Sequence, residues 1–201
     1  MSINVCNNNS LSAITSIPDS ITGSALNLIS TQTASSSSTI DFTSGIDSTY
    51  KEYIFKFYDM NPATDDSSFS FQASTNGGSS YGVTATTTAF VALHYEDDSD
   101  ASLSYSTGQD QAQSTGFINL AHAIGNGSDE SGSGTLHLFD PSNTTFVKHF
   151  ILRSNMYQSG SYSFDINVAG YFNVTAAIDG LQFSMSSGNI DSGTFKLYGV
   201  V

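Results

Sequence analysis

Carboxylates are the residues of this sequence that could most readily do chemistry, because glycoside hydrolysis needs two of them on either side of the scissile bond. Only three of the 18 acidic residues are glutamates: Glu52, Glu96 and Glu130. Glu52 alternates with apolar residues in a predicted strand, whereas Glu96 and Glu130 lie in acidic and glycine-rich loops. No predicted strand carries two Glu flanking an Asp, an arrangement used for glucan hydrolysis. We therefore predict no glycosidase activity.

Possible metal ligands are concentrated in one segment, which contains Glu96, Asp97, Asp98 and Asp100. Several hard oxygen ligands close together suit Ca²⁺, but the glycine and the distal Glu of an EF-hand loop are missing at the required offsets. We favour a solvated loop that ends a strand. The four histidines are far apart in sequence and form no HExxH pair, so we predict no zinc site.

Nucleophilic catalysis has no support in the sequence. No G-x-S-x-G turn occurs, and the single cysteine, Cys6, lies in a polar segment without a basic neighbour that would favour the thiolate. One cysteine cannot form an internal disulfide. The sequence therefore predicts a protein that is not an enzyme and that needs no cofactor.

Sugar binding stays open as an alternative, because tyrosine rings can stack on pyranose faces. Three tyrosines in predicted loops, near Asp or Asn residues, are the candidate contacts: Tyr81, Tyr105 and Tyr157. The chain has no Trp, which is the usual stacking platform of carbohydrate-binding modules.

The elements that would position these residues are predicted to be β-strands. The chain is rich in Ser and Thr, and its 14 Phe and 10 Tyr supply large apolar areas despite an apolar fraction of 38%. Apolar residues alternate with polar ones along most of the chain, in roughly nine or ten segments separated by turn residues. This pattern predicts an all-β, antiparallel two-sheet sandwich of jelly-roll type. The expected core includes Phe55, Phe57, Phe69, Phe71, Leu136, Leu138, Phe183 and Phe195.

Two segments are harder to interpret. Asn76, Gly77 and Gly78 tolerate positive φ, so they predict a hairpin in which the strand at 69–73 pairs with a strand resuming at Tyr81 and Val83. Residues 109–122 fit either a short helix or a strand. Residues 125–134 are rich in Gly and Ser and predict a loop.

The net charge of −13 excludes two classes of partner. Binding to phosphate backbones or to anionic membranes requires clustered Lys and Arg, and the chain has five such residues in total. No stretch approaches the ~20 apolar residues of a membrane span, and we find no signal peptide. We expect a protein that binds neither nucleic acid nor membrane.

The N-terminal segment differs from the rest. Residues 1–23 are polar and aperiodic, so we expect an arm, followed by one sandwich domain over residues 24–201. Ile14 and Ile17 are the largest apolar side chains in the second half of the arm. They are the candidate anchors to a neighbouring subunit.

Two stretches carry a resemblance to a known group of proteins: YIFKFYDMNPATDDSSFSFQASTN at 53–76 and SSGNIDSGTFKLYGVV at the C-terminus. They resemble small virion proteins of tailed phages, particularly phages of marine bacteria, with concanavalin A-like or jelly-roll sandwiches. The resemblance covers about residues 24–201, and the segment 193–199, GTFKLYG, is its most specific part. It implies a sandwich fold and a place in a virion, but no catalytic or ligand-binding residue.

Within a virion, the resemblance and the compact chain favour a capsid decoration (cement) protein on the outer shell, made in the host cytoplasm. We expect a homo-oligomer, such as a trimer, that contacts the major capsid protein or another virion protein. The alternative is a tail or fibre module that recognises glycans on the host surface.

Overall fold

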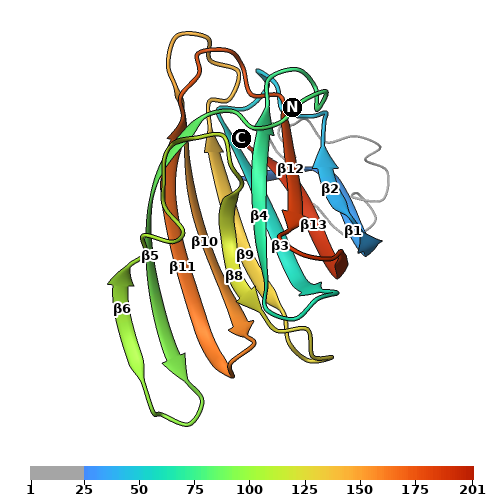
Figure 1. The fold of residues 1–201 in the computed structure, drawn as a ribbon. Helices are drawn as coiled ribbons and strands as arrows, with labels where there is room; N and C mark the ends of the chain where they lie inside the picture. Colours follow the sequence, from blue (N-terminus) through green and yellow to red (C-terminus); the bar gives the residue numbers. More distant parts are fainter. Residues whose placement is uncertain (1–24) are drawn as a thin grey trace, which may run out of the picture.

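A computed structural model describes residues 25–201 of the chain as an all-β protein (Figure 1). The strands in chain order are β1 (Leu26–Ser37), β2 (Thr39–Phe42), β3 (Glu52–Pro62), β4 (Ser67–Ser74), β5 (Ala85–Tyr95), β6 (Ala101–Tyr105), β7 (Gln111–Ser114), β8 (Ile118–Ile124), β9 (Gly132–Phe139), β10 (Lys148–Gln158), β11 (Tyr162–Phe172), β12 (Gly180–Met185) and β13 (Ile190–Val200). All of their pairings are antiparallel.

The strands form two packed layers (Figure 1). The large sheet has the order β1-β13-β3-β9-β10-β11-β5, and β6 and β7 both pair with the outer edge of β5. The small sheet has the order β2-β12-β4-β8. The two sheets are joined along one side by a single residue pair, Gln158 with Ile124. The prediction of an all-β, antiparallel sandwich is confirmed, and the chain passes repeatedly from one layer to the other.

Aromatic rings fill the space between the layers. All eight residues predicted for the core are at most 2% exposed. Phe183 on β12 is at the centre, because its ring contacts five other phenylalanine rings with centroid separations between 5.7 and 6.2 Å. These partners come from four strands in both sheets, so Phe183 ties the layers together.

The hairpin predicted after residue 73 is wrong. β4 pairs with β12 and β8 inside the small sheet, whereas the chain after Gly78 crosses to the large sheet and forms β5 against β11. Gly77 and Gly78 do have positive φ, of 66° and 80°. They reverse the chain as expected, but the turn leads to the other layer.

The segments that were ambiguous in the sequence form strands. Residues 109–122 contain β7 and most of β8, with no helix. The loop predicted for 125–134 ends earlier, because β9 starts at Gly132. Gly134 lies inside the sheet where an added Cβ would be 2.6 Å from Cζ of Phe57. The glycine is therefore required at this position of the strand, because the Phe57 ring occupies the space that a side chain would need.

One cation lies inside the sandwich, at the start of β10. Lys148 is 0% exposed, and its Nζ donates hydrogen bonds to the carbonyl oxygens of Phe146, Val174 and Thr175 at 2.8–3.1 Å. These three bonds use all the protons of the ammonium group. Burial lowers the pKa of Lys148, although the charge of Asp140 opposes that shift. Lys148 thus holds the β9–β10 and β11–β12 connections together.

We predict that Phe183→Ala lowers the free energy of unfolding by about 3–5 kcal/mol, because it removes a ring from the centre of a close-packed cluster. Urea denaturation measures the change. Phe146→Ala is the control, since Phe146 is 68% exposed and loss of its side chain should cost no more than about 0.5 kcal/mol. Similar losses for the two variants would contradict this description of the core.

Candidate functional site

The outer face of the large sheet presents polar side chains from neighbouring strands. Side chains alternate between the faces of a strand, and on β10 the buried Leu152 and Met156 alternate with exposed or partly exposed residues. Arg153, Asn155 and Tyr157 therefore lie on the outer face. Pairing brings β9 and β11 alongside them.

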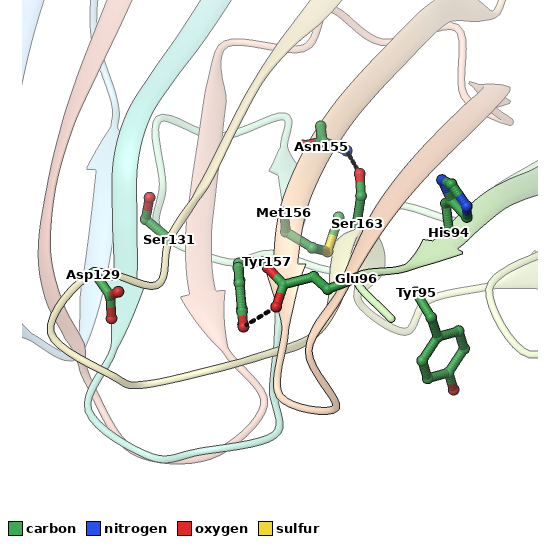
Figure 2. A pocket seen from close by; sticks show the side chains of 9 residues that line it. All are labelled: His94, Tyr95, Glu96, Asp129, Ser131, Asn155, Met156, Tyr157 and Ser163. Atoms are coloured by element: carbon green, nitrogen blue, oxygen red, sulfur yellow. Dashed lines mark hydrogen bonds between the residues drawn. The ribbon is translucent and has the colours of Figure 1, made fainter. Parts of the chain in front are cut away.

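One hollow lies at the end of this face and has a volume of about 510 Å³ (Figure 2). Figure 2 shows Tyr157 and Glu96 joined by a hydrogen bond, in which the phenol donates to Oε2 at 3.2 Å. Asn155 donates from Nδ2 to Oγ of Ser163 at 2.9 Å. Asp129 completes the polar lining from the β8–β9 connection.

A second hollow of about 640 Å³ adjoins the first and shares Asn155 and Ser163 with it. Arg153 and Asp165 dominate this part. The guanidinium donates from Nε to Oδ1 at 3.1 Å and from Nη2 to Oδ2 at 2.8 Å, a bidentate geometry that fixes both groups. The hydrogen bond to Asp165 raises the pKa of Arg153.

The two hollows share Asn155 and Ser163 and together form a groove lined by polar residues, the polar groove. Three pairs of its side chains are hydrogen-bonded to each other: Arg153 with Asp165, Asn155 with Ser163, and Tyr157 with Glu96. Polar groups fixed in this way can orient a ligand through hydrogen bonds. The first hollow contains two carboxylates, on Glu96 and Asp129, but both residues are exposed. A catalytic carboxylic acid is usually buried, because burial keeps it protonated.

A third hollow, of about 530 Å³, is lined mainly by apolar groups and lies at the β9–β10 connection. Phe139, Phe146 and Val147 supply its apolar surface, and Asp140 and His149 are at its margin. Phe146 is 68% exposed. Its backbone carbonyl is one of the three acceptors of Lys148, so the buried cation supports the wall of this hollow.

The three tyrosines predicted as glycan contacts lie at three separate places. Tyr157 lines the first hollow of the polar groove. Tyr105 is on β6, where its phenol donates to Oδ2 of Asp110 at 2.7 Å. Tyr81 is partly buried beside the small sheet, and its phenol donates to Oδ1 of Asp41 at 2.9 Å. The arm anchors Ile14 and Ile17 lie outside the described residues.

The acidic residues considered as catalytic or metal-binding candidates in the sequence contact other groups of the protein. Between residues 25 and 201, no group of three or more His, Cys, Asp or Glu side chains is placed to hold a metal ion. Asp98 contacts Nε2 of His94 at 3.0 Å, and Oε2 of Glu130 accepts from the backbone N–H of Gly127 at 2.7 Å. Glu52 contacts Nδ1 of His137 at 2.6 Å.

Sequence reasoning missed the groove residues Arg153, Asp165 and Asn155. Alternation continued from Leu152 would have placed Arg153 on the outer face of its strand. What the sequence could not supply is the pairing of β10 with β11, which sets Asn155 opposite Asp165 and brings Arg153 into diagonal contact with that carboxylate.

Comparisons with protein-family models, with curated proteins and with solved structures gave no match. In the part of the chain that the structure describes, no helix has the length and apolar character needed to cross a membrane.

Tyr81 predicts a pH dependence of stability. Burial, and next the hydrogen bond to Asp41, raise the pKa of Tyr81 from 10.0 to about 12. A raised pKa in the folded state gives stabilisation that is complete below the unfolded value and is lost as the pH rises through the folded value. The loss between pH 10 and 12 amounts to at most about 2–3 kcal/mol.

We therefore expect Tyr81→Phe to flatten the alkaline part of the stability profile. Urea denaturation at about pH 9 and about pH 11.5 should show a smaller decrease in the free energy of unfolding for the variant than for the wild type. Equal decreases would mean that the Tyr81 phenol titrates as it does in the unfolded chain.

Proposed function

We propose that the protein is a non-catalytic structural protein of a tailed-phage virion, an oligomeric decoration protein on the outer capsid shell. The resemblance of segments 53–76 and 186–201 to phage virion proteins supports a place in a virion. The net charge of −13 supports an outward-facing position, since it keeps a surface soluble and away from packaged DNA.

An apolar strip at the free edge of the large sheet carries the proposal of assembly. Phe90 on β5 pairs with Tyr105 on β6, and Leu103 lies two residues along β6 on the same face. These side chains are 49%, 56% and 73% exposed. All five residues of β6 are exposed, and in the described structure this strand pairs only with β5.

Such a surface is unfavourable for an isolated molecule. An edge strand with open backbone donors and acceptors invites pairing with another chain, and contiguous exposed apolar groups mark interaction sites. Charged residues usually protect an edge of this kind, but β6 has the sequence ASLSY and carries none. The strip therefore supports a contact with a neighbouring subunit.

We predict that Leu103→Asp weakens oligomerisation, because it places a charge in the centre of the strip. Light scattering coupled to size-exclusion chromatography should show a shift to smaller species, with an unchanged circular dichroism spectrum. Ile151→Asp is the matched control, since Ile151 is 52% exposed on the outer face but lies on β10. Oligomers that persist in Leu103→Asp, or a wild-type monomer at high concentration, would contradict this role of the strip.

The position of the protein in particles tests the capsid assignment. Hundreds of copies on the shell agree with decoration, whereas a few copies at the tail would favour the receptor-binding alternative. Deletion of residues 2–20 should abolish incorporation while the sandwich stays folded. Normal incorporation of the truncated protein would refute the role of the arm and of Ile14 and Ile17.

The polar groove favours a second candidate function, recognition of host-surface glycans. Tyr157 is the tyrosine candidate that lines a hollow, where it lies beside Glu96 and Asn155. If the groove binds sugar, Tyr157→Ala should abolish glycan-array signals and adsorption to host cells. Tyr171→Ala should leave both unchanged, because Tyr171 pairs with His149 at the end of β11 far from the groove. An array without hits for the wild type would remove this candidate.

A further inference from the structure

The five basic residues of the chain fall into two groups by their partners. Nζ of Lys51 pairs with Asp140 at 2.9 Å, Arg153 pairs with Asp165, and Lys148 is enclosed by backbone carbonyls. Lys56 and Lys196 are different, since neither forms an ion pair with any residue in 25–201.

These two lysines are placed against each other. Lys56 on β3 and Lys196 on β13 are direct cross-strand partners, and like charges in that position are destabilising. Within residues 25–201 no carboxylate forms an ion pair with either ammonium group. An anion bound from solution would therefore relieve the repulsion.

Two tyrosines complete the cluster in a crossed arrangement. Nζ of Lys56 lies 5.8 Å from the ring centroid of Tyr198, and Nζ of Lys196 lies 5.8 Å from that of Tyr58. Both separations are near the outer limit of a cation–π contact, so the rings hold the ammonium groups in place without neutralising them. Burial, and next the neighbouring Tyr198 phenol, raise the pKa of Tyr58.

The cluster faces outward from the sandwich. Phe57 and Phe195 are buried on the opposite face of the same two strands, so alternation places Lys56 and Lys196 on the outer face. Thr135 on β9 is the cross-strand partner of Lys56, and Thr135 also lines the second hollow of the polar groove. The two cations therefore lie at one end of a surface that already offers hydroxyl, amide and carboxylate groups.

We propose that Lys56, Lys196, Tyr58 and Tyr198 form a binding site for an acidic saccharide. Its carboxylate or sulfate group lies between the two ammonium groups, one sugar ring packs on a tyrosine face, and the hydroxyl groups extend toward Thr135. A nucleic acid fits poorly, because a net charge of −13 repels a dense polyanion at long range. A protein partner is served better by the apolar strip on β5 and β6. The site does not depend on where the protein lies in a particle.

Isothermal titration with three short probes tests the site on the full-length protein: trigalacturonate, a sulfated galactose trisaccharide, and neutral galactotriose. We expect one or both acidic probes to bind, the neutral probe to bind at least about tenfold more weakly, and the affinity to fall as salt is raised. The preference between the first two probes identifies the acidic group. Binding of all three with equal affinity, or of none at millimolar concentration, overturns the proposal.

Matched variants separate this site from a general effect of charge. Lys56→Gln and Lys196→Gln should each weaken binding of the acidic probe about tenfold, the effect of losing one hydrogen bond to a charged group. Lys51→Gln makes the same change in net charge at a different surface position and should leave the affinity unchanged. Tyr198→Ala should also weaken binding, with circular dichroism confirming the fold.

Two outcomes would contradict the assignment even if the acidic probe binds. Equal losses in Lys51→Gln and Lys56→Gln would show that only net charge matters. Equal binding of a glutamate tripeptide would show that the site recognises carboxylates without a sugar ring. In either case the proposal of a saccharide site fails, whatever the position of the protein in a virion.

Discussion

The contact between the two sheets through phenylalanine rings, packed edge-on or tilted against one another, is the constraint on which the rest of the molecule depends. With 38% apolar residues, the chain has few side chains to bury, and large phenylalanine rings supply much of the apolar area in its interior, beside Ile, Leu and Val. Phe183 stacks on Phe69 and Phe71 within the small sheet and reaches Phe55 and Phe195 in the large one. Because these rings must interdigitate, strand registers are fixed. The fixed registers in turn determine which polar residues meet on the outer face.

The sequence was sufficient for fold class and core but not for the candidate site. Alternation around Phe55 and Phe69 depends on a local rule, the two-residue period of a strand, so it can be read without knowing any partner. The hairpin after residue 73 failed because turn residues specify a reversal of the chain and not the sheet that it enters. The glycine-rich sequence around Gly134 predicted a loop. The reason for a glycine in this strand is the Phe57 ring, which is distant in the sequence. The groove depends on the pairing of β10 with β11, which no local pattern encodes.

The scarcity of cations gives each of them a distinct physical setting. Lys148 keeps its ammonium group inside the protein only because three carbonyl dipoles replace its lost hydration. Arg153 is tied to a carboxylate in a bidentate pair at the surface, where water and salt weaken the interaction. Lys56 and Lys196 sit beside each other with aromatic rings as their only cation-binding neighbours in the described structure. The acidic molecule as a whole repels a large polyanion at a distance. The two ammonium groups on the outer face attract a small anion at close range.

The position of β13 in the large sheet has a consequence for how the protein is made. This strand is encoded after all the others, yet it lies between β1 and β3, and β12 likewise separates β2 from β4. The large sheet is incomplete until residues 190–200 have been synthesised, and the small sheet until residues 180–185 have been. Until β13 is present, β1 has no partner strand and one edge of β3 is open. The complete sandwich therefore cannot form before β13 has been synthesised, although most of the other strand pairs can.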